Sequence, residues 1–205
     1  MLTQKKLKSY HKRRRSEIVR RLDEFKKNRK SMTDTEIFLE LCFCLCTPQS
    51  KAVKVAQVVN KDNLSELMRS SQPKLAQMLR RNTRFHNNKA RHIIAARRFI
   101  PNLKSLSRDP VIAREYLVRN IKGLGYKEAG HFLRNIGYRD LCIIDRHVVS
   151  LMYELKVFES DAMPGTQKKY LEMEQQIKDY AKRIKIDVDE LDLLLWSIKT
   201  GHVFK

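Results

Sequence analysis

The chain has 205 residues, with 43 Lys or Arg against 23 Asp or Glu, and its formal net charge is +20. No apolar run approaches the roughly 18 residues that span a membrane, and the basic N-terminus lacks the apolar core of a signal peptide. These features argue against a membrane protein and predict one or two small packed domains in an intracellular, cytoplasmic protein.

A charge of this size favours a polyanionic partner, because cations that neutralise phosphates release counterions. Charge alone does not separate DNA from RNA or from anionic lipid. No basic helix of this chain also carries the large exposed apolar face that a membrane-surface helix needs. We therefore expect the partner to be a nucleic acid.

Helical periodicity recurs along the chain, and no alternating strand pattern interrupts it, so the predicted fold is all-α. The first helix covers residues 4–30 and includes four successive cations, Lys12 to Arg15. A solvated helix face is the preferred interpretation of this run, although the run could also attract DNA.

The second helix starts at a capping box formed by Thr33 and Glu36. It ends near Thr47, because Pro48 disfavours the helical conformation of the residue before it. Proline, glycine and acidic caps, among them Asp109 before Pro110, delimit the later helices. We expect them at residues 51–60, 73–80, 88–99, 109–121, 126–136, 145–155, 167–184 and 188–199.

The chain has four cysteines, and their spacing does not suit a metal site or a disulfide framework. Three of them alternate within the apolar second helix, and no C-x-x-C pair occurs among Cys42, Cys44, Cys46 and Cys142. An iron–sulfur cluster would need four suitably spaced cysteines. We expect buried, reduced thiols and no metal. His131 and His147 are interpreted as helix-surface or phosphate-contacting residues for the same reason.

Two glycines, Gly123 and Gly125, join the helix that ends at Ile121 to the helix that starts at Tyr126. Glycine tolerates a positive φ and allows close approach of the backbone. A helix N-terminus with exposed amides can bind a phosphate oxygen without reading sequence. An ordinary turn between helices is the alternative. The nearby cations, among them Lys122, favour binding to a DNA backbone.

Lys127 and Asp145 are the candidate catalytic residues. Lys127 lies in the first turn of a helix, where the helix dipole and neighbouring cations should lower its pKa. A lysine of that kind is a nucleophile that forms Schiff bases, and the alternative is a solvated or phosphate-binding lysine. Asp145 follows an apolar run, at the position expected for an N-cap. It could stabilise a cationic transition state or take a proton, or it could serve only as a helix cap.

These residues resemble a known family. The run Ile-Lys-Gly-Leu-Gly-Tyr-Lys-Glu-Ala and the Asp of Ile-Ile-Asp-Arg-His, 18 residues after the lysine, are similar to the helix-hairpin-helix DNA glycosylase superfamily. Two sequence motifs, Gly-Tyr-Lys-Glu-Ala and His-Phe-Leu-Arg-Asn-Ile-Gly-Tyr, resemble those of the type 2 (archaeal-type) 8-oxoguanine DNA glycosylase/AP lyases. The resemblance is strongest over residues 112–150. Weaker matches are Cys-Phe-Cys-Leu-Cys-Thr-Pro-Gln-Ser, Arg84-Phe85 with Lys89-Ala90, and the tail from Trp196 to Lys205.

The resemblance implies two helical subdomains with an active-site cleft between them. One is a bundle of residues 33–139 that contains the helix-hairpin-helix motif, and the other combines residues 1–32 with residues 140–205. Lys127 and Asp145 would face each other across the cleft, and the damaged base would flip out of the duplex. By this analogy Lys127 displaces the base, and the resulting Schiff base permits β-elimination, so the enzyme is expected to be bifunctional.

The resemblance also suggests further site residues. Phe85, next to Arg84, could fill the space left by the flipped nucleotide, or the pair could be core and surface on a loop. Trp196 could stack on the base, although a lone indole is often core. The terminal carboxylate at Lys205 could accept a hydrogen bond from N7–H of 8-oxoguanine, and a frayed tail is the alternative. Gln49 is a further candidate for the base pocket. The remaining candidates are expected to bind DNA: Lys122, Gly123, Gly125, Arg146 and His147.

The expected partner is double-stranded DNA that contains an oxidised base, and the expected oligomeric state is a monomer. No cofactor is expected, although the hairpin could hold a monovalent cation. The absence of a cysteine cluster argues against the iron–sulfur branch of the superfamily. Two alternatives stay open: a glycosylase for another oxidised base, and a non-enzymatic helix-hairpin-helix module that binds DNA by its backbone.

Overall fold

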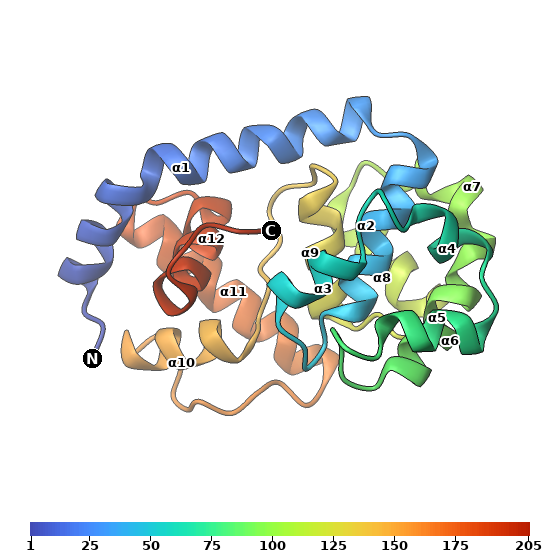
Figure 1. Cartoon of the computed structure of the whole chain (residues 1–205). Helices are drawn as coiled ribbons and strands as arrows, with labels where there is room; N and C mark the ends of the chain where they lie inside the picture. Colours follow the sequence, from blue (N-terminus) through green and yellow to red (C-terminus); the bar gives the residue numbers. More distant parts are fainter. The chain divides into compact units, whose positions relative to one another are not determined.

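The computed structural model describes all 205 residues, as helices joined by loops, with no β-strand (Figure 1). The all-α prediction is confirmed. The chain forms two compact units, a central unit of residues 29–136 and a terminal unit of residues 1–28 and 137–205. The boundaries expected from sequence, 33 and 139, differ from these by four and three residues. None of the helices combines the length and the apolar character that crossing a membrane requires.

The central unit is built around one apolar helix, α2 (Asp34–Cys46), which contacts α3, α4, α6, α7 and α9. These neighbours and the rest of the unit are α3 (Ala52–Val58), α4 (Leu64–Arg69), α5 (Gln72–Leu79), α6 (His86–Ala96), the 3₁₀ turn η1 (Arg97–Phe99), α7 (Ile100–Leu103), α8 (Pro110–Asn120) and α9 (Tyr126–Asn135).

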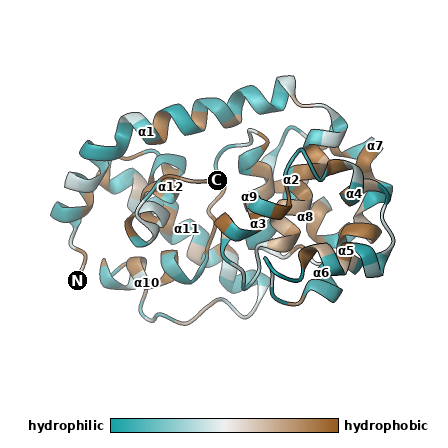
Figure 2. Ribbon diagram, in the orientation of Figure 1, coloured by the Kyte–Doolittle hydropathy of each residue, from teal (hydrophilic) through white to brown (hydrophobic).

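The predicted capping box starts α2. The amide of Glu36 donates to Thr33 Oγ1 at 3.3 Å, and the amide of Thr33 donates to Glu36 Oε2 at 2.9 Å. Every residue of α2 from Leu41 to Cys46 is buried, and the helix is largely apolar in Figure 2. A helix that is buried all round forms the core of a domain, so α2 is the element on which the hairpin helix α9 packs.

Two short helices of the central unit were not expected from the sequence. The helix α4 begins after Asn63, which makes no side-chain cap. The helix expected at residues 88–99 ends at Ala96 as α6, and helical backbone continues through η1 into α7, which has Pro101 in its first turn. Proline is tolerated there because the first amides of a helix have no intrahelical partner.

The terminal unit contains α10 (Arg146–Glu154), α11 (Gln167–Ile184), α12 (Val188–Thr200) and most of α1 (Gln4–Ser31). The helix α12 contacts both α10 and α11. Two polar side chains of α1 attach it to the α12 region. His11 Nε2 lies 2.6 Å from Glu190 Oε2, and Arg14 donates to the carbonyl of Gly201 at 2.7 Å.

Candidate active site

The turn between α8 and α9 requires glycine at only one of its two positions. Gly123 has a φ of +97°, and an added Cβ would lie 2.7 Å from Cγ of His92 and closer still to its Nδ1. Gly125 has an ordinary φ of −91° and precedes α9 as its N-cap. The positive φ that glycine tolerates is therefore found at Gly123 and not at Gly125. Gly123 lies against His92 of α6, whose pKa is lowered by burial and by nearby cations.

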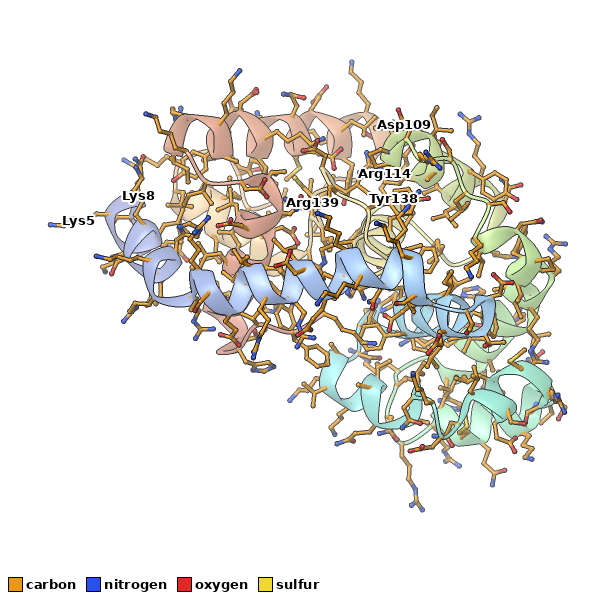
Figure 3. All side chains as sticks on the ribbon, turned by 90° about the horizontal axis from the view of Figure 1, so that it is seen from above. Lys5, Lys8, Asp109, Arg114, Tyr138 and Arg139 are labelled. Atoms are coloured by element: carbon orange, nitrogen blue, oxygen red, sulfur yellow. The ribbon has the colours of Figure 1, made fainter.

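Side chains of α8 and α9 hold the two arms of the hairpin together. The Tyr126 hydroxyl donates to the Glu115 carboxylate, and burial together with this bond raises the pKa of Tyr126 to about 12. The guanidinium of the fully buried Arg114 lies 5.2 Å from the centre of the Tyr126 ring. Figure 3 labels Arg114 in α8 and Asp109 just before it. Asp109 caps α8 as predicted, because its Oδ1 accepts from the amide of Val111 at 2.8 Å.

Lys127 lies in the first turn of α9, as the spacing predicts. Its side chain is 25% exposed, and its Nζ lies 3.3 Å from Glu128 Oε1. Glu128 was not among the candidate residues, although it is the next residue in the chain. The hairpin therefore presents a partly exposed amine that has a carboxylate beside it. Beyond this first turn, residues 129–135 are all buried.

A second lysine, Lys89 of α6, was missed as a functional candidate. It is almost completely buried, with 4% exposure. Burial and the positive charges of Lys127 and Arg84 lower its pKa to about 8. The sequence offers little signal for such a residue, because its spacing within α6 does not distinguish it from a solvated lysine.

Asp145 is the N-cap of α10 in the terminal unit. Its Oδ1 accepts from the amide of Val148 at 2.8 Å, which confirms the predicted cap, and its side chain stays partly exposed. Arg146 and His147, which follow it, are exposed. A negative charge therefore lies at a helix N-terminus, with a cation and an imidazole beside it.

The segment before Asp145 is held by polar side chains of α11 and α12. It is buried but is neither helix nor strand. Its amides need other acceptors, and they donate to Glu174 from Cys142 at 2.9 Å, to Asp192 from Ile143 at 2.8 Å and to the Tyr170 hydroxyl from Ile144 at 3.2 Å. The buried carboxylates of this unit thus fix the backbone that carries Asp145.

The C-terminal tail folds back onto α12. The ring of Trp196 is stacked with that of Phe204 at a centroid distance of 6.3 Å, and it meets His202 edge-on at 5.9 Å. Val203 is buried, and Lys205 is half-buried. The tail is therefore not frayed, and the candidate Trp196 belongs to an ordered aromatic cluster with His202 and Phe204.

The candidates Gln49, Arg84 and Phe85 lie in loops of the central unit. Gln49 and Phe85 both adopt left-handed backbone conformations, with φ of 53° and 54°. Phe85 is 52% exposed, which contradicts the alternative that it belongs to the core, and the Arg84 guanidinium lies 5.4 Å from the centre of its ring. Large exposed aromatics in strained loops are typical of binding surfaces.

The histidine interpretation is wrong for one of the two residues. His131 is buried in α9 and meets the ring of Phe43 edge-on at 5.8 Å, because it points toward α2 and not toward solvent. All four cysteines are buried, as expected, and burial raises the pKa of Cys46 to about 12. No group of three or more His, Cys, Asp or Glu side chains is placed to hold a metal ion.

Comparisons with known proteins agree with this arrangement. The family model described as 8-oxoguanine DNA glycosylase matches residues 18–186. The "8-oxoguanine DNA glycosylase/AP lyase" of Fusobacterium nucleatum is 37% identical over 199 residues, covering 93% of this chain and 92% of the relative. The protein of the same name from Methanocaldococcus jannaschii is 37% identical over 193 residues, covering 92% and 91%.

Solved structures give the same result. The crystal structure of the 8-oxoguanine DNA glycosylase of Thermotoga maritima matches with a TM-score of 0.91 at 32% identity, covering 98% of this chain and 97% of that chain. The Methanocaldococcus jannaschii enzyme in complex with a 15mer DNA containing 8-oxoguanine matches with a TM-score of 0.87 at 36% identity, covering 97% and 99%. The chain belongs to the 8-oxoguanine DNA glycosylase family.

Proposed function

We propose that this protein excises 8-oxoguanine from double-stranded DNA and then cleaves the strand as an AP lyase. The observation that carries the proposal is the position of Lys127, which lies in the first turn of α9 directly after the glycine hairpin. A module that only binds the DNA backbone needs no such amine. Relatives named 8-oxoguanine DNA glycosylase/AP lyase match more than nine-tenths of this chain.

The first chemical step is displacement of the base by Lys127. The amine must be neutral to attack, so the ammonium first gives up a proton, and Glu128 at 3.3 Å is within reach to receive it. The amine forms a bond to C1′ of the flipped nucleotide. The glycosidic bond breaks, its electron pair leaves with the base, and the base takes up a proton.

Asp145 stabilises the positive charge that develops on the sugar during this step. Its carboxylate is held in place by the Val148 amide, so little reorganisation is needed when the charge appears. The proposed mechanism requires Lys127 and Asp145 to act on the same flipped nucleotide.

Strand cleavage follows from the covalent intermediate. The sugar ring opens to leave an imine between Lys127 and C1′, and the imine makes the C2′ proton acidic. Loss of that proton expels the 3′ phosphate by β-elimination, and hydrolysis of the imine regenerates the lysine. The electrophile that the lyase step needs is made from Lys127 itself, so the proposed reaction requires no cofactor.

The other candidates are assigned to DNA contacts. The hairpin and the start of α10 bind phosphates through Lys122, Gly123, Gly125, Arg146 and His147, and a monovalent cation at the hairpin would add to this contact. Arg84 and Phe85 occupy the space left by the flipped nucleotide. Gln49, Trp196 and Lys205 are assigned to recognition of the base. The protein acts as an intracellular monomer on chromosomal DNA.

A single-turnover assay on a defined duplex tests this function. A labelled duplex with one 8-oxoguanine opposite cytosine is incubated with the protein, and base release and strand cleavage are measured separately. We expect both products from this duplex and neither from the undamaged control. If the protein releases only oxidised pyrimidines from a panel of lesions, the assigned substrate is wrong. If it binds every duplex and cleaves none, it is a binding module.

A further inference from the structure

Lys89 of α6 binds three acceptors in the interior of the central unit. Its Nζ donates to the carbonyl of Cys46 at 2.6 Å, to the carbonyl of Pro48 at 2.9 Å and to Ser50 Oγ at 2.7 Å. These three groups are enough to satisfy the three N–H bonds of an ammonium. All three acceptors lie at the end of α2 or in the loop after it.

The three bonds fix the loop that carries Gln49. The carbonyl of Cys46 belongs to the last turn of α2, where carbonyls lack an intrahelical partner. Pro48 and Ser50 flank Gln49, which is exposed and has a φ of 53°. A non-glycine residue in this conformation carries strain of order 1 kcal/mol, so the surrounding bonds must hold it there.

Ser50 connects this loop to a second one. Its Oγ accepts a hydrogen bond from the amide of Arg84 at 2.9 Å, in addition to the bond from Lys89. Arg84 precedes Phe85, whose φ is 54°. Hydrogen bonds of Lys89 and Ser50 thus connect the two loops that carry Gln49 and Phe85. Both of these residues have a left-handed backbone conformation and an exposed side chain.

The charged form of Lys89 has no carboxylate among its hydrogen-bond partners. Uncompensated burial of a charge is unfavourable for folding, and Lys127 and Arg84 add repulsion. An apolar side chain at this position would avoid both costs. A lysine is unfavourable here for folding alone, yet it makes three hydrogen bonds to the loop. We therefore look to function for the role of Lys89.

We infer that Lys89 is a positioning residue that holds the Gln49 loop and the Arg84–Phe85 loop in the geometry needed to receive an extruded base. The inference rests on the proposed function. Lys89 does not touch the reacting atoms, and Lys127 carries out the chemistry. Loss of the Lys89 bonds should therefore impair reactions that depend on base recognition and spare those that depend only on Lys127.

Two substrates separate these reactions. Excision of 8-oxoguanine requires base recognition, whereas borohydride trapping on a preformed abasic site requires Lys127 but has no base to recognise. We expect Lys89→Met to slow single-turnover excision by about 10- to 100-fold, since small misplacements of binding groups have effects of that size. Trapping on the abasic site should change by less than about 3-fold. Lys54→Met, which replaces an exposed lysine of α3, should match the wild type in both assays.

A second variant keeps the inference testable if Lys89→Met fails to fold. Ser50→Ala removes the hydroxyl that connects the two loops and leaves Lys89 in place. It should reduce excision more than trapping, in the same direction as Lys89→Met. The inference would be overturned if Lys89→Met and Ser50→Ala both keep full excision and trapping. It would also be overturned if both variants lose excision and trapping to the same extent. A wild type inactive on both substrates would instead refute the proposed function.

The pH dependence supplies a readout that a structural role alone would not move. The groups that face Lys89 are Cys46 of α2, Arg84 of the second loop and Lys127 of α9. A lysine whose pKa is lowered to about 8 loses its proton as the pH rises through that value. The neutral amine has only two N–H bonds for three acceptors. The ratio of excision to abasic trapping should therefore fall above pH 8 in the wild type and stay flat in Lys89→Met. A ratio that falls equally in both proteins would count against the inference.

Discussion

In the hairpin, position 123 requires glycine for two reasons, its backbone conformation and its close packing. Its φ of +97° is rare for residues with a side chain, and His92 occupies the space that a Cβ would need. Gly125 lacks the positive φ, and its hypothetical Cβ meets only a flexible carboxylate, Glu128 Oε2, at 3.1 Å. The two glycines of one motif therefore have unequal requirements, which the sequence alone does not reveal.

Gly123→Ala should destabilise the protein by roughly 1–3 kcal/mol, because it combines an unfavourable φ with displacement of the His92 ring. Urea denaturation measures the loss, and fluorescence anisotropy should show weaker duplex binding. Gly165→Ala is the matched control, since its Cβ would meet nothing within 4 Å and its φ is not positive. Equal stability of the two variants would contradict the steric argument.

Asp145→Asn separates the catalytic role of this residue from its role as a cap. Asparagine caps helices about as well as aspartate, so α10 should remain stable while the negative charge is lost. Base release should slow by roughly 10²–10³-fold, the usual effect of deleting a group that stabilises a transition state, with duplex binding largely unchanged. Asp109→Asn makes the same change at the cap of α8 and should leave the rate unaltered. An unchanged rate in Asp145→Asn would reduce the residue to a cap.

At the scale of elements, local signals at helix ends were the most informative part of the sequence. The capping box at Thr33, the Asp109 cap and the Asp145 cap all occur where they were predicted, because each depends on a few adjacent residues. The helices α4 and α7 escaped prediction because they are short, and α7 begins at a proline-containing turn.

Long-range contacts explain what the sequence could not predict at the site. Lys89 is buried because the ends of α2 and α6 meet, and His131 is buried because α9 packs on α2. The carboxylates of Glu174 and Asp192 bind backbone amides more than thirty residues earlier in the chain. Residue identity and spacing carry no information on such pairs until the helices are assembled.

The capping box at the start of α2 should stabilise the protein less as the solution becomes acidic. Hydrogen bonds from Lys61 and from Thr33 lower the pKa of Glu36 from 4.5 to about 2. A carboxyl group whose pKa is lowered in the folded state stabilises the fold above its ordinary pKa, and this contribution is lost as the pH falls toward 2. Glu36 is partly exposed, so solvent screening keeps the effect small.

Glu36→Gln should therefore lower the free energy of unfolding by about 0.5–1 kcal/mol at pH 7. The difference from the wild type should shrink as the pH falls below 4.5. Urea denaturation at pH values from 7 to 3 provides the comparison. Glu159→Gln, which replaces an exposed loop carboxylate, should show no such trend. A difference that persists unchanged in acid would mean that the charge of Glu36 is not involved.

At the scale of the whole molecule, the positive charge is concentrated in the N-terminal helix. The helix α1 contains thirteen Lys or Arg and three Asp or Glu, which accounts for half of the net charge of +20. Lys5 and Lys8 are exposed near its N-terminal end, and the Lys5 side chain extends away from the helix in Figure 3. The composition predicts a polyanionic partner, and the structure adds that many of these cations are exposed.

Replacing Lys5 and Lys8 with Gln should weaken duplex binding without slowing excision at saturating protein. The logarithm of the binding constant falls linearly with the logarithm of the salt concentration. If both lysines contact phosphates, the magnitude of this negative slope should decrease by about 1 to 2. Lys168 and Lys182 of α11 are also exposed, and their double replacement with Gln gives a control of equal charge. Identical slopes for the two double variants would assign the effect to net charge and not to contacts of α1.

Formation of a Schiff base by Lys127 is the central step of the proposed mechanism, and borohydride trapping tests it directly. The wild type and Lys168→Gln, which removes an exposed lysine of α11, should each form a covalent adduct when reduced during incubation with a duplex containing 8-oxoguanine. Lys127→Gln should fold and bind the same duplex but form no adduct. An adduct of undiminished yield in Lys127→Gln would show that another amine is the nucleophile and would contradict the mechanism.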